Sequence, residues 1–149
     1  MSEPVLRRSV RPGHWEGVEE LRYKQEQGRG TFDRVTRQVL FEDAGGAQWR
    51  YFEIAAGGHT TLERHQHTHA VMILRGGGRC LVGDRICELA EGDLVSVPAQ
   101  TWHQFRAPPD APLGFLCLVS RERDRPQLPA PEDIARLRAD PAIGDFIRA

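Results

Sequence analysis

The chain has 149 residues, with 20 basic and 21 acidic side chains and a formal net charge of −1. That length favours one domain with its own core, and so small a net charge excludes the electrostatic attraction that binds nucleic acid or an anionic membrane. No apolar run approaches the roughly 20 residues that cross a bilayer, and the polar N-terminus lacks the hydrophobic stretch of a signal peptide, so the sequence predicts a cytoplasmic protein.

Residues 1–34 are expected to form an N-terminal arm that packs on the rest of the protein or on a partner subunit. They contain charged residues and glycines, with a weak helical pattern at Val18, Leu21 and Arg22. From 35 to 120 the chain consists of short runs rich in Val, Ile, Leu, Phe and Trp, separated by glycine-rich and proline-rich turns. Regular short strands separated in this way predict an all-β sandwich or barrel.

One hairpin within this region can be aligned by its turn. If Gly83-Asp84 is a two-residue turn, Cys80 lies directly opposite Cys87 on the neighbouring strand. The chain has three cysteines, an odd set that argues against a disulfide framework in a reducing compartment. We interpret Cys80 and Cys87 as small half-buried side chains rather than as a redox pair.

Residues 121–149 are expected to form a C-terminal extension with a short helix. Pro131 is followed by two acidic residues, which suits the first turn of a helix. Ile134 and Leu137 follow at helical spacing. Pro141 is expected to end this helix before a last short turn.

Histidines and one glutamate gather in the middle of the chain. Five of the six histidines fall between 59 and 103. On an extended strand Glu63 and His65 point the same way, with Cα atoms about 7 Å apart. His69 begins the next apolar run, and His103 lies on a distant one. Side chains from such separate strands can converge only inside a curved sheet.

The spacing around these residues resembles the first motif of the cupin family. That motif reads glycine, five residues, His-x-His, three or four residues, Glu, six residues, glycine. Here Gly57 is followed by five residues, Glu63, one residue, His65, three residues, His69, six residues and Gly76. Glutamate stands where the first histidine is usual, and histidine stands where the glutamate is usual. The inventory of three imidazoles and one carboxylate is therefore kept in exchanged positions.

The second cupin motif is also matched in part. It reads glycine, five residues, proline, one residue, glycine, two residues, histidine, three residues, asparagine. Here Gly92 leads by five residues to Pro98, and His103 stands where the histidine belongs. Gln100 and Ala107 replace the glycine and the asparagine. The resemblance implies an all-β fold, a cupin jelly-roll β-barrel (double-stranded β-helix), followed here by a short C-terminal helix.

The resemblance also implies one divalent transition metal held by Glu63, His65, His69 and His103. Three neutral imidazoles and a carboxylate suit Mn, Fe, Co, Ni, Cu or Zn, and the sequence does not choose among them. In another register His65 and His67 form the histidine pair, but no acidic residue and no leading glycine then stand where the motif needs them. His67 is therefore placed in the bend, as a donor behind the ligands or a catalytic base facing the substrate.

Strand alternation predicts the walls of the site. Counting from His69 and His103, the side chains of Val71, Ile73 and Phe105 face inward and make the pocket largely apolar around a polar centre. Candidates for anchoring a carboxylate are Tyr51, Arg37 and Arg50. Candidates for holding the second nitrogen of the imidazoles are Gln104, Glu53 and Gln66.

A metal with one carboxylate ligand keeps a net charge near +1, which favours a small anionic or enolizable substrate. Three functions stay open: a cupin dioxygenase as the leading interpretation, a metal-dependent lyase, isomerase or hydrolase, and a non-catalytic small-molecule-binding module. On the other face of the strand that starts at His69, Ala70, Met72 and Leu74 are apolar. A strand apolar on both faces is buried on both, which favours a homodimer, although the N-terminal arm could also cover this face.

Overall fold

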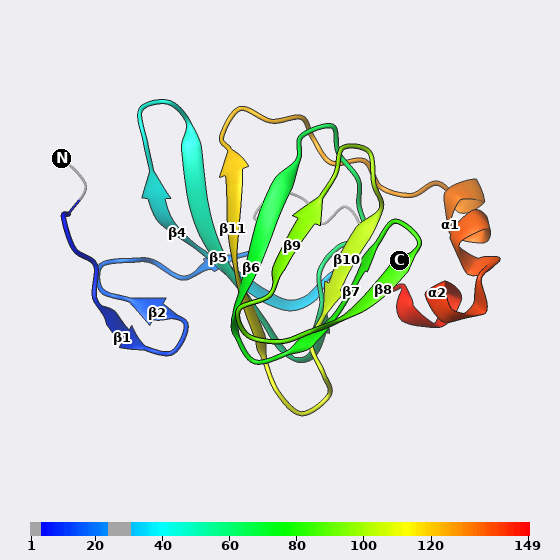
Figure 1. Cartoon of the computed structure of the whole chain (residues 1–149), viewed down its shortest axis with the longest axis horizontal. Helices are drawn as coiled ribbons and strands as arrows, with labels where there is room; N and C mark the ends of the chain where they lie inside the picture. Colours follow the sequence, from blue (N-terminus) through cyan, green and yellow to red (C-terminus); the bar gives the residue numbers. More distant parts are fainter. Residues whose placement is uncertain (1–3, 24–30) are drawn as a thin grey trace.

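The computed structural model describes residues 4–23 and 31–149, and Figure 1 shows a curled antiparallel sheet with helices beside one end. Within those residues no helix is long and apolar enough to span a bilayer. The elements, in chain order, are β1 (Ser9–Arg11), β2 (His14–Trp15), β3 (Leu21–Arg22), β4 (Asp33–Glu42), β5 (Ala47–His59), β6 (His69–Arg75), β7 (Gly78–Val82), β8 (Arg85–Leu89), β9 (Leu94–Val97), β10 (His103–Arg106), β11 (Leu113–Ser120), α1 (Pro131–Arg138) and α2 (Pro141–Phe146).

The main sheet joins strands that are far apart in the chain. Its order is β8-β7-β10-β5-β11-β6-β9, with β4 paired to β5 and β3 to β4. All these pairs are antiparallel. Neighbours such as β5 and β11 arise by crossover connections, and such connections are typical of a jelly roll. The predicted cupin jelly-roll fold is therefore confirmed.

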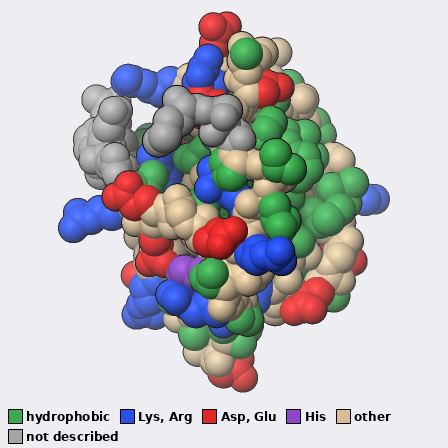
Figure 2. Space-filling view, turned by 90° about the vertical axis from the view of Figure 1, so that its left-hand side faces the viewer, with side chains coloured by type: hydrophobic (Ala, Val, Ile, Leu, Met, Phe, Trp, Pro, Cys, Tyr) green, Lys and Arg blue, Asp and Glu red, His purple; other side chains and the backbone are tan. Residues whose placement is uncertain are grey.

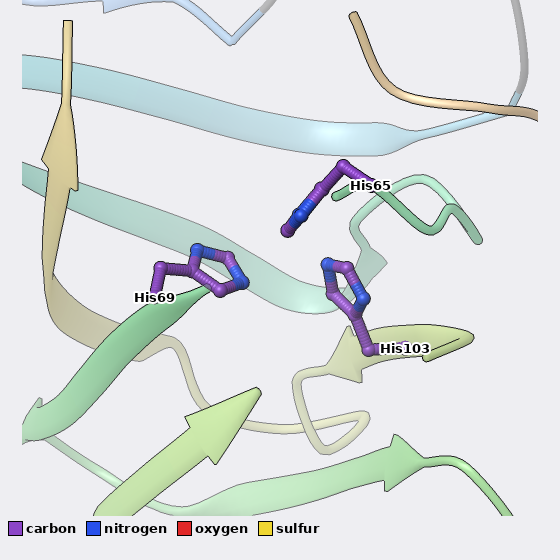
Figure 3. A group of neighbouring side chains, drawn as sticks. All are labelled: His65, His69 and His103. Atoms are coloured by element: carbon purple, nitrogen blue, oxygen red, sulfur yellow. The ribbon is translucent and has the colours of Figure 1, made fainter. Parts of the chain in front are cut away.

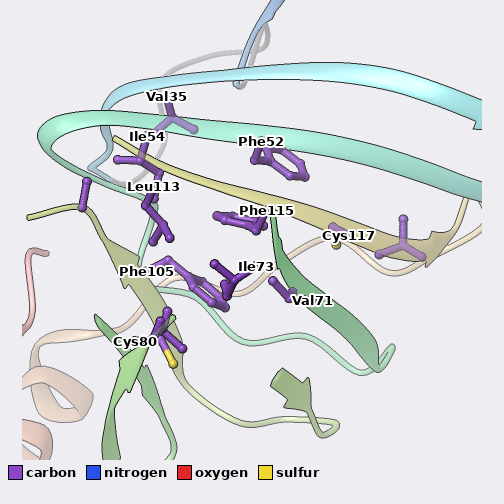
Figure 4. Close-up of a cluster of buried hydrophobic side chains, with 13 residues drawn as sticks. Val35, Phe52, Ile54, Val71, Ile73, Cys80, Phe105, Leu113, Phe115 and Cys117 are labelled. Carbon is purple, nitrogen blue, oxygen red and sulfur yellow. The ribbon is translucent and has the colours of Figure 1, made fainter. Parts of the chain in front are cut away.

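The core lies inside the curl, where β5, β6, β10 and β11 present alternate residues to one another (Figure 4). Phe115 on β11 stacks on Phe52 of β5 and on Phe105 of β10, with ring centroids 5.5 and 4.9 Å apart. The register explains this stack, because Phe115 is paired directly with Phe52. The apolar packing fixes the positions of the strand ends that carry the site.

The C-terminal extension packs on the outside of the barrel. Residues Ile143 and Phe146 of α2 join Leu62 and Leu81 in a second apolar cluster. Pro131 stands at the start of α1, and Pro141 opens α2 rather than only ending α1, because Asp140 accepts hydrogen bonds from the first amides of the new helix.

The N-terminal arm is not helical where the pattern suggested it. Leu21 lies in β3, which pairs with the edge of β4, and Val18 lies between strands. Gly13 and Gly17 both have positive φ angles, 75° and 70°, which interrupt a helix. The arm covers the outer face of β5, where Trp15 contacts Tyr51 with ring centroids 5.0 Å apart. At β3, backbone hydrogen bonds to the edge of β4 therefore outweigh the weak helical preference of the sequence.

The β7–β8 hairpin has the expected register. Cys80 pairs with Cys87 across the strands, and Gly83 in the turn has a positive φ angle of 67°. Both cysteines are free thiols, with Cys80 buried and Cys87 exposed.

Candidate metal centre

Three histidines converge at one end of the barrel, and Figure 3 shows their rings directed toward one another. His65 lies on the segment between β5 and β6, His69 is the first residue of β6, and His103 is the first residue of β10. Each offers one nitrogen, and these three nitrogens all lie within 4.8 Å of one another. This spacing lets a single ion reach all three histidines.

Backbone pairing sets the positions of these histidines. The amide of His103 donates to Glu63 O at 3.0 Å, and the amide of Glu63 donates to His103 O at 3.2 Å. His65 O accepts from the amide of Gln100 at 2.7 Å. His69 is paired with Val97 of β9. Each histidine is thus anchored to a different part of the sheet before any ion binds.

The outer ring nitrogens are held by the protein. Nδ1 of His65 lies 2.7 Å from His67 O, and Nδ1 of His103 lies 2.9 Å from Thr101 O. A carbonyl oxygen can only accept, so both Nδ1 atoms carry the proton and both Nε2 atoms are left with lone pairs for a metal. Backbone carbonyls therefore hold the second ring nitrogens, a role that we expected for the side chains of Gln104, Glu53 and Gln66.

His69 gives the most direct sign that an ion fits. Its Nδ1 lies 3.3 Å from Cys117 Sγ, while its Nε2 is buried and has no hydrogen-bond partner among the described residues. An unsatisfied buried nitrogen costs about 1–3 kcal/mol, and a metal ion would satisfy it. The donor set of three imidazoles also suits a divalent transition metal.

Burial keeps the imidazoles in their metal-binding form. It lowers the pKa of His69 to about 2, with smaller contributions in the same direction from His103 and His65. Burial also lowers the pKa of His103, and the nearby Glu63 carboxylate partly opposes this effect. A neutral imidazole is the form that binds a metal, so His69 and His103 are ready to bind at neutral pH.

Glu63, the fourth expected ligand, lies on the wall of the same cavity but outside the group of three nitrogens. Its backbone is bonded to His103, and its side chain is nearly buried, with 9% exposed. The structure therefore brings three of the four expected ligands together and places the carboxylate beside them.

His67 lies beside the three nitrogens rather than among them, and it lines the same cavity. Its ring stacks on His65, with centroids 3.7 Å apart and planes at 6°. Its Nδ1 lies 2.7 Å from Asp124 Oδ1, and Asp124 also accepts from the amides of Gln66 and His67 at 2.7 and 2.9 Å. These amide hydrogen bonds are the main reason that the pKa of Asp124 is lowered. Nothing in the local sequence indicated Asp124, which is 57 residues from His67.

The three histidines open into a cavity of about 1080 Å³. Of the residues expected on its walls, Val71, Phe105, Arg37 and Arg50 are present. Ile73 is fully buried in the core and is not a wall residue.

Tyr51 does not reach the cavity. Alternation on β5 turns it to the outer face, where its hydroxyl donates to Glu53 Oε1 at 2.9 Å. Arg75 completes this outer group by donating to the same carboxylate at 2.6 Å. Gln104 also faces outward, and its amide group bonds to the backbone of Arg148. The expectation that Tyr51 anchors a substrate was based on residue type, and the pleat of the strand excludes it.

Cys117 is a wall residue that sequence reasoning missed. It lies on the inner face of β11, with Sγ 3.3 Å from His69 Nδ1 and 3.8 Å from Arg50 Nη2. Burial raises the pKa of its thiol, and Arg50 opposes that shift. The apolar run PLGFLCLVS gave a signal for a strand, but only the register of β11 against β5 shows which of its side chains point inward.

A segment after β11 closes one side of the cavity. We call residues 121–128 the strap. Its Gln127 exchanges two backbone hydrogen bonds with Arg64, at 3.1 and 2.7 Å, and its Asp124 holds the loop at His67. The strap residues on the cavity wall are Arg123, Arg125, Pro126, Gln127 and Leu128. The sequence placed this stretch in a C-terminal extension without a role at the site.

A jelly-roll barrel with histidines converging at its open end defines the class of protein. Residues 50–119 match the family model described as the cupin domain, and the chain belongs to the cupin family.

One curated protein and two crystal structures are similar over most of this chain. A Rhodospirillum rubrum protein named 1-methylthio-D-xylulose 5-phosphate methylsulfurylase is 55% identical over 134 residues, which are 89% of this chain and 85% of that protein. A crystal structure of a cupin 2 conserved barrel domain protein from Rhodopseudomonas palustris is 54% identical, with a TM-score of 0.90 and coverage of 97% of this chain and 99% of the other. A cupin-2 domain from Rhodospirillum rubrum is 54% identical, with a TM-score of 0.83 and coverage of 89% of both chains.

Proposed function

We propose that this protein is a metal-dependent enzyme that removes the methylthio group from a phosphorylated 1-methylthio-ketose. The observation that carries the proposal is the position of Cys117, whose sulfur lies in the same cavity as the three histidines and 3.3 Å from His69 Nδ1. Support comes from the Rhodospirillum rubrum relative, whose name states a methylsulfurylase of 1-methylthio-D-xylulose 5-phosphate.

His65, His69 and His103 would hold one divalent transition metal through their inward nitrogens. Such an ion supplies Lewis acidity, which stabilises negative charge that develops on a carbonyl oxygen. Val71 and Phe105 give the cavity apolar walls that exclude water from the reacting atoms. The chain itself therefore binds and orients the ketone end of the substrate beside the Cys117 sulfur.

The proposed reaction transfers a methylthio group from carbon to sulfur. The Cys117 sulfur attacks the methylthio sulfur, a sulfur–sulfur bond forms, and the bond between that sulfur and carbon 1 breaks. The electron pair stays on carbon 1, next to the ketone. Carbon 1 takes up one proton, which balances the proton that the Cys117 thiol loses. Carbon 1 is reduced to a methyl group, and Cys117 is oxidised to a mixed disulfide. A small external thiol would then restore Cys117 by exchange.

Single turnover without added thiol tests this proposal. Metal-loaded protein is mixed with 1-methylthio-D-xylulose 5-phosphate, and the protein mass and the sugar product are measured. We expect Cys117 to gain one methylthio group and one 1-deoxy-ketose phosphate to form for each. Cys117→Ser should abolish both while keeping its metal, and Cys87→Ser is the matched control. Unchanged turnover in Cys117→Ser would exclude this cysteine as the acceptor, and absence of any consumption by the wild type would overturn the proposed function.

The dioxygenase predicted from the sequence is a different outcome of the same assay. A centre of three histidines also suits iron and O₂ chemistry. An oxygen electrode separates the two possibilities, because methylthio transfer to Cys117 consumes no O₂. Turnover that stops under argon and consumes O₂ in proportion to the product would favour the dioxygenase.

A further inference from the structure

We infer that Arg37, Arg50 and Arg123 form a binding site for a dianionic phosphate group in the cavity that also holds Cys117. The inference rests on the proposed function for the identity of the ligand, a phosphate ester of a small sugar. The three side chains come from β4, β5 and the strap, and all of them line the cavity that holds the histidines. We call them the arginine cluster.

Register brings the first two arginines to the inner face of the sheet. Arg37 is paired with Phe52, and Arg50 is paired with Cys117, and both of these partners point into the barrel. The Arg50 guanidinium lies over the Phe52 ring at 4.9 Å, which holds its plane in place. Two arginines on adjacent strands therefore share one wall.

The strap adds the third arginine. The guanidinium of Arg123 is tied back to its own segment through Nη1, which donates to Ser120 O at 2.9 Å. Burial lowers the pKa of Arg123, and the charges of Arg50 and Arg37 lower it further. The three arginines line one cavity, and this shared lining is the geometric reason to assign them to one ligand.

Two members of the arginine cluster, Arg50 and Arg123, differ from other arginines of the chain in their partners. Elsewhere in the chain arginines meet carboxylates, as Arg75 does with Glu53 and Arg121 with Glu42. Among the residues that the structure describes, neither Arg50 nor Arg123 has such an ion pair, and Nε of Arg50 is buried without a hydrogen-bond partner. Repulsion between half-enclosed cations is costly, and Glu63 on the same cavity wall opposes it at Arg123. An anionic ligand reduces that cost further.

Phosphate fits this arrangement better than the carboxylate we expected from the sequence. A phosphate ester carries close to two negative charges and three free acceptor oxygens, which match several guanidinium forks at once. The contacts also run in order, from His69 to Cys117 to Arg50, with Sγ 3.3 Å from the imidazole and 3.8 Å from the guanidinium. One cavity therefore offers a site for each group of the proposed substrate, the histidines for the ketone, Cys117 for the methylthio group and the arginine cluster for the phosphate.

Calorimetric titration of the metal-loaded protein tests the arginine cluster without any turnover. D-xylulose 5-phosphate and D-xylulose serve as a charged and a neutral probe. We expect Arg123→Gln and Arg37→Gln each to weaken binding of the phosphate ester by about ten- to a hundred-fold, since each removes hydrogen bonds to a charged group, and to leave binding of D-xylulose unchanged. The matched control is Arg85→Gln, on the exposed side of β8. Inorganic phosphate should compete with the ester in the wild type.

The outcomes separate the cluster from the proposed reaction. Equal affinity of wild type and both variants for D-xylulose 5-phosphate would overturn the arginine cluster, even if methylthio transfer is observed. Arginine-dependent binding of the ester, together with no methylthio transfer, would support the cluster and overturn the proposed function. Circular dichroism and metal analysis of each variant are the controls, because they show whether the fold and the metal content are kept.

Discussion

At the scale of single residues, the centre is made by side chains whose environments differ although their types are the same. His65 and His103 each donate Nδ1 to a backbone carbonyl, whereas His69 has its Nδ1 beside a thiol and its Nε2 buried without a partner. His67 is paired with Asp124 instead. The hydrogen bonds of the outer nitrogens, rather than the number of histidines, therefore distinguish a ligand from a neighbour.

Removal of a ligand should release the metal while the fold is kept. We expect His103→Ala and His65→Ala to weaken metal binding by more than about a hundredfold, because even loss of a group that merely orients a ligand costs 10–100-fold. Metal content after dialysis against a chelator measures this. His14→Ala, on the N-terminal arm, is the control. Full occupancy in both variants would contradict the assignment of the centre.

Sequence reasoning was informative at the residues that carry motif spacing and weak elsewhere. His65, His69 and His103 could be found because the pleat of a strand and the spacing of glycines constrain where such side chains point. Cys117 and Asp124 could not be found in this way, because each contacts a histidine far along the chain. Cys117 is 48 residues from its partner, and Asp124 is 57 residues from its own. Tyr51 shows the converse case, in which a suitable residue type lies on the wrong face of the right strand.

At the scale of elements, the local sequence predicted the turns and helix starts correctly, whereas it did not predict the structure of the N-terminal arm. The β7–β8 register and the start of α1 are set by nearby residues, so the sequence predicted both. In the N-terminal arm β3 pairs with the edge of β4, and Trp15 packs on Tyr51 of β5. A local sequence pattern does not contain these distant contacts. Local preference yields wherever the sheet offers unpaired hydrogen-bonding groups.

Strand β11 passes so close to Tyr51 that a side chain does not fit between them. A Cβ atom at Gly114 would lie 2.8 Å from Tyr51 Cζ and 3.0 Å from Arg75 Cβ. We expect Gly114→Ala to lower the free energy of unfolding by about 1–3 kcal/mol, as overpacking does. Urea titration measures this. Gly45→Ala is the control, since its nearest contact would be 3.4 Å, and an equal effect of the two changes would refute the packing argument.

The strap depends on Asp124 for its attachment to the loop at His67. Asp124→Ala removes the acceptor for two amides and one imidazole. We expect the strap to open more often and trypsin to cut after Arg121 several times faster, because cleavage follows the population of the open form. Asp110→Ala, in a different loop, is the control. Equal cleavage rates would show that Asp124 does not hold the strap.

The attachment should persist over the whole neutral range of pH. Amide hydrogen bonds lower the pKa of Asp124 below its ordinary value of 3.8. A carboxyl with a depressed folded-state pKa stabilises above the unfolded value and loses that contribution as the pH falls through the folded value. The difference in urea midpoint between wild type and Asp124→Ala should thus be constant from pH 7 to 5 and shrink below about 4. A difference that shrinks already between pH 7 and 5 would assign the effect to His67 instead.

At the scale of the whole molecule, the barrel separates an inner polar centre from an outer apolar face. Figure 2 shows acidic and basic side chains interspersed over one face, with hydrophobic side chains gathered along one side of it. Register makes the outer apolar residues neighbours across strands, since Leu118 pairs with Trp49 and Met72 with Leu94. The outer residues that stay exposed are Phe41, Trp49, Met72, Leu74, Leu94 and Leu118.

We propose that the homodimer expected from the sequence forms through that outer face. The N-terminal arm covers Tyr51 but leaves Met72 and Leu94 with 39% and 61% of their surface exposed. We expect sedimentation analysis to give a dimer, and Leu94→Glu to give a monomer, because a charge is costly in an apolar interface. Val10→Glu, on the arm, is the control. A monomeric wild type at all concentrations would reject this prediction.

The strap also connects the arginine cluster to the loop at His67 through two consecutive residues. Arg123 belongs to the arginine cluster, and Asp124 grips the backbone next to His65. If an anionic ligand orders the strap at Arg123, it also steadies the loop at His65, and an ion held by His65 steadies the strap in return. Thermodynamic linkage requires the two affinities to rise by the same factor, whichever species arrives first.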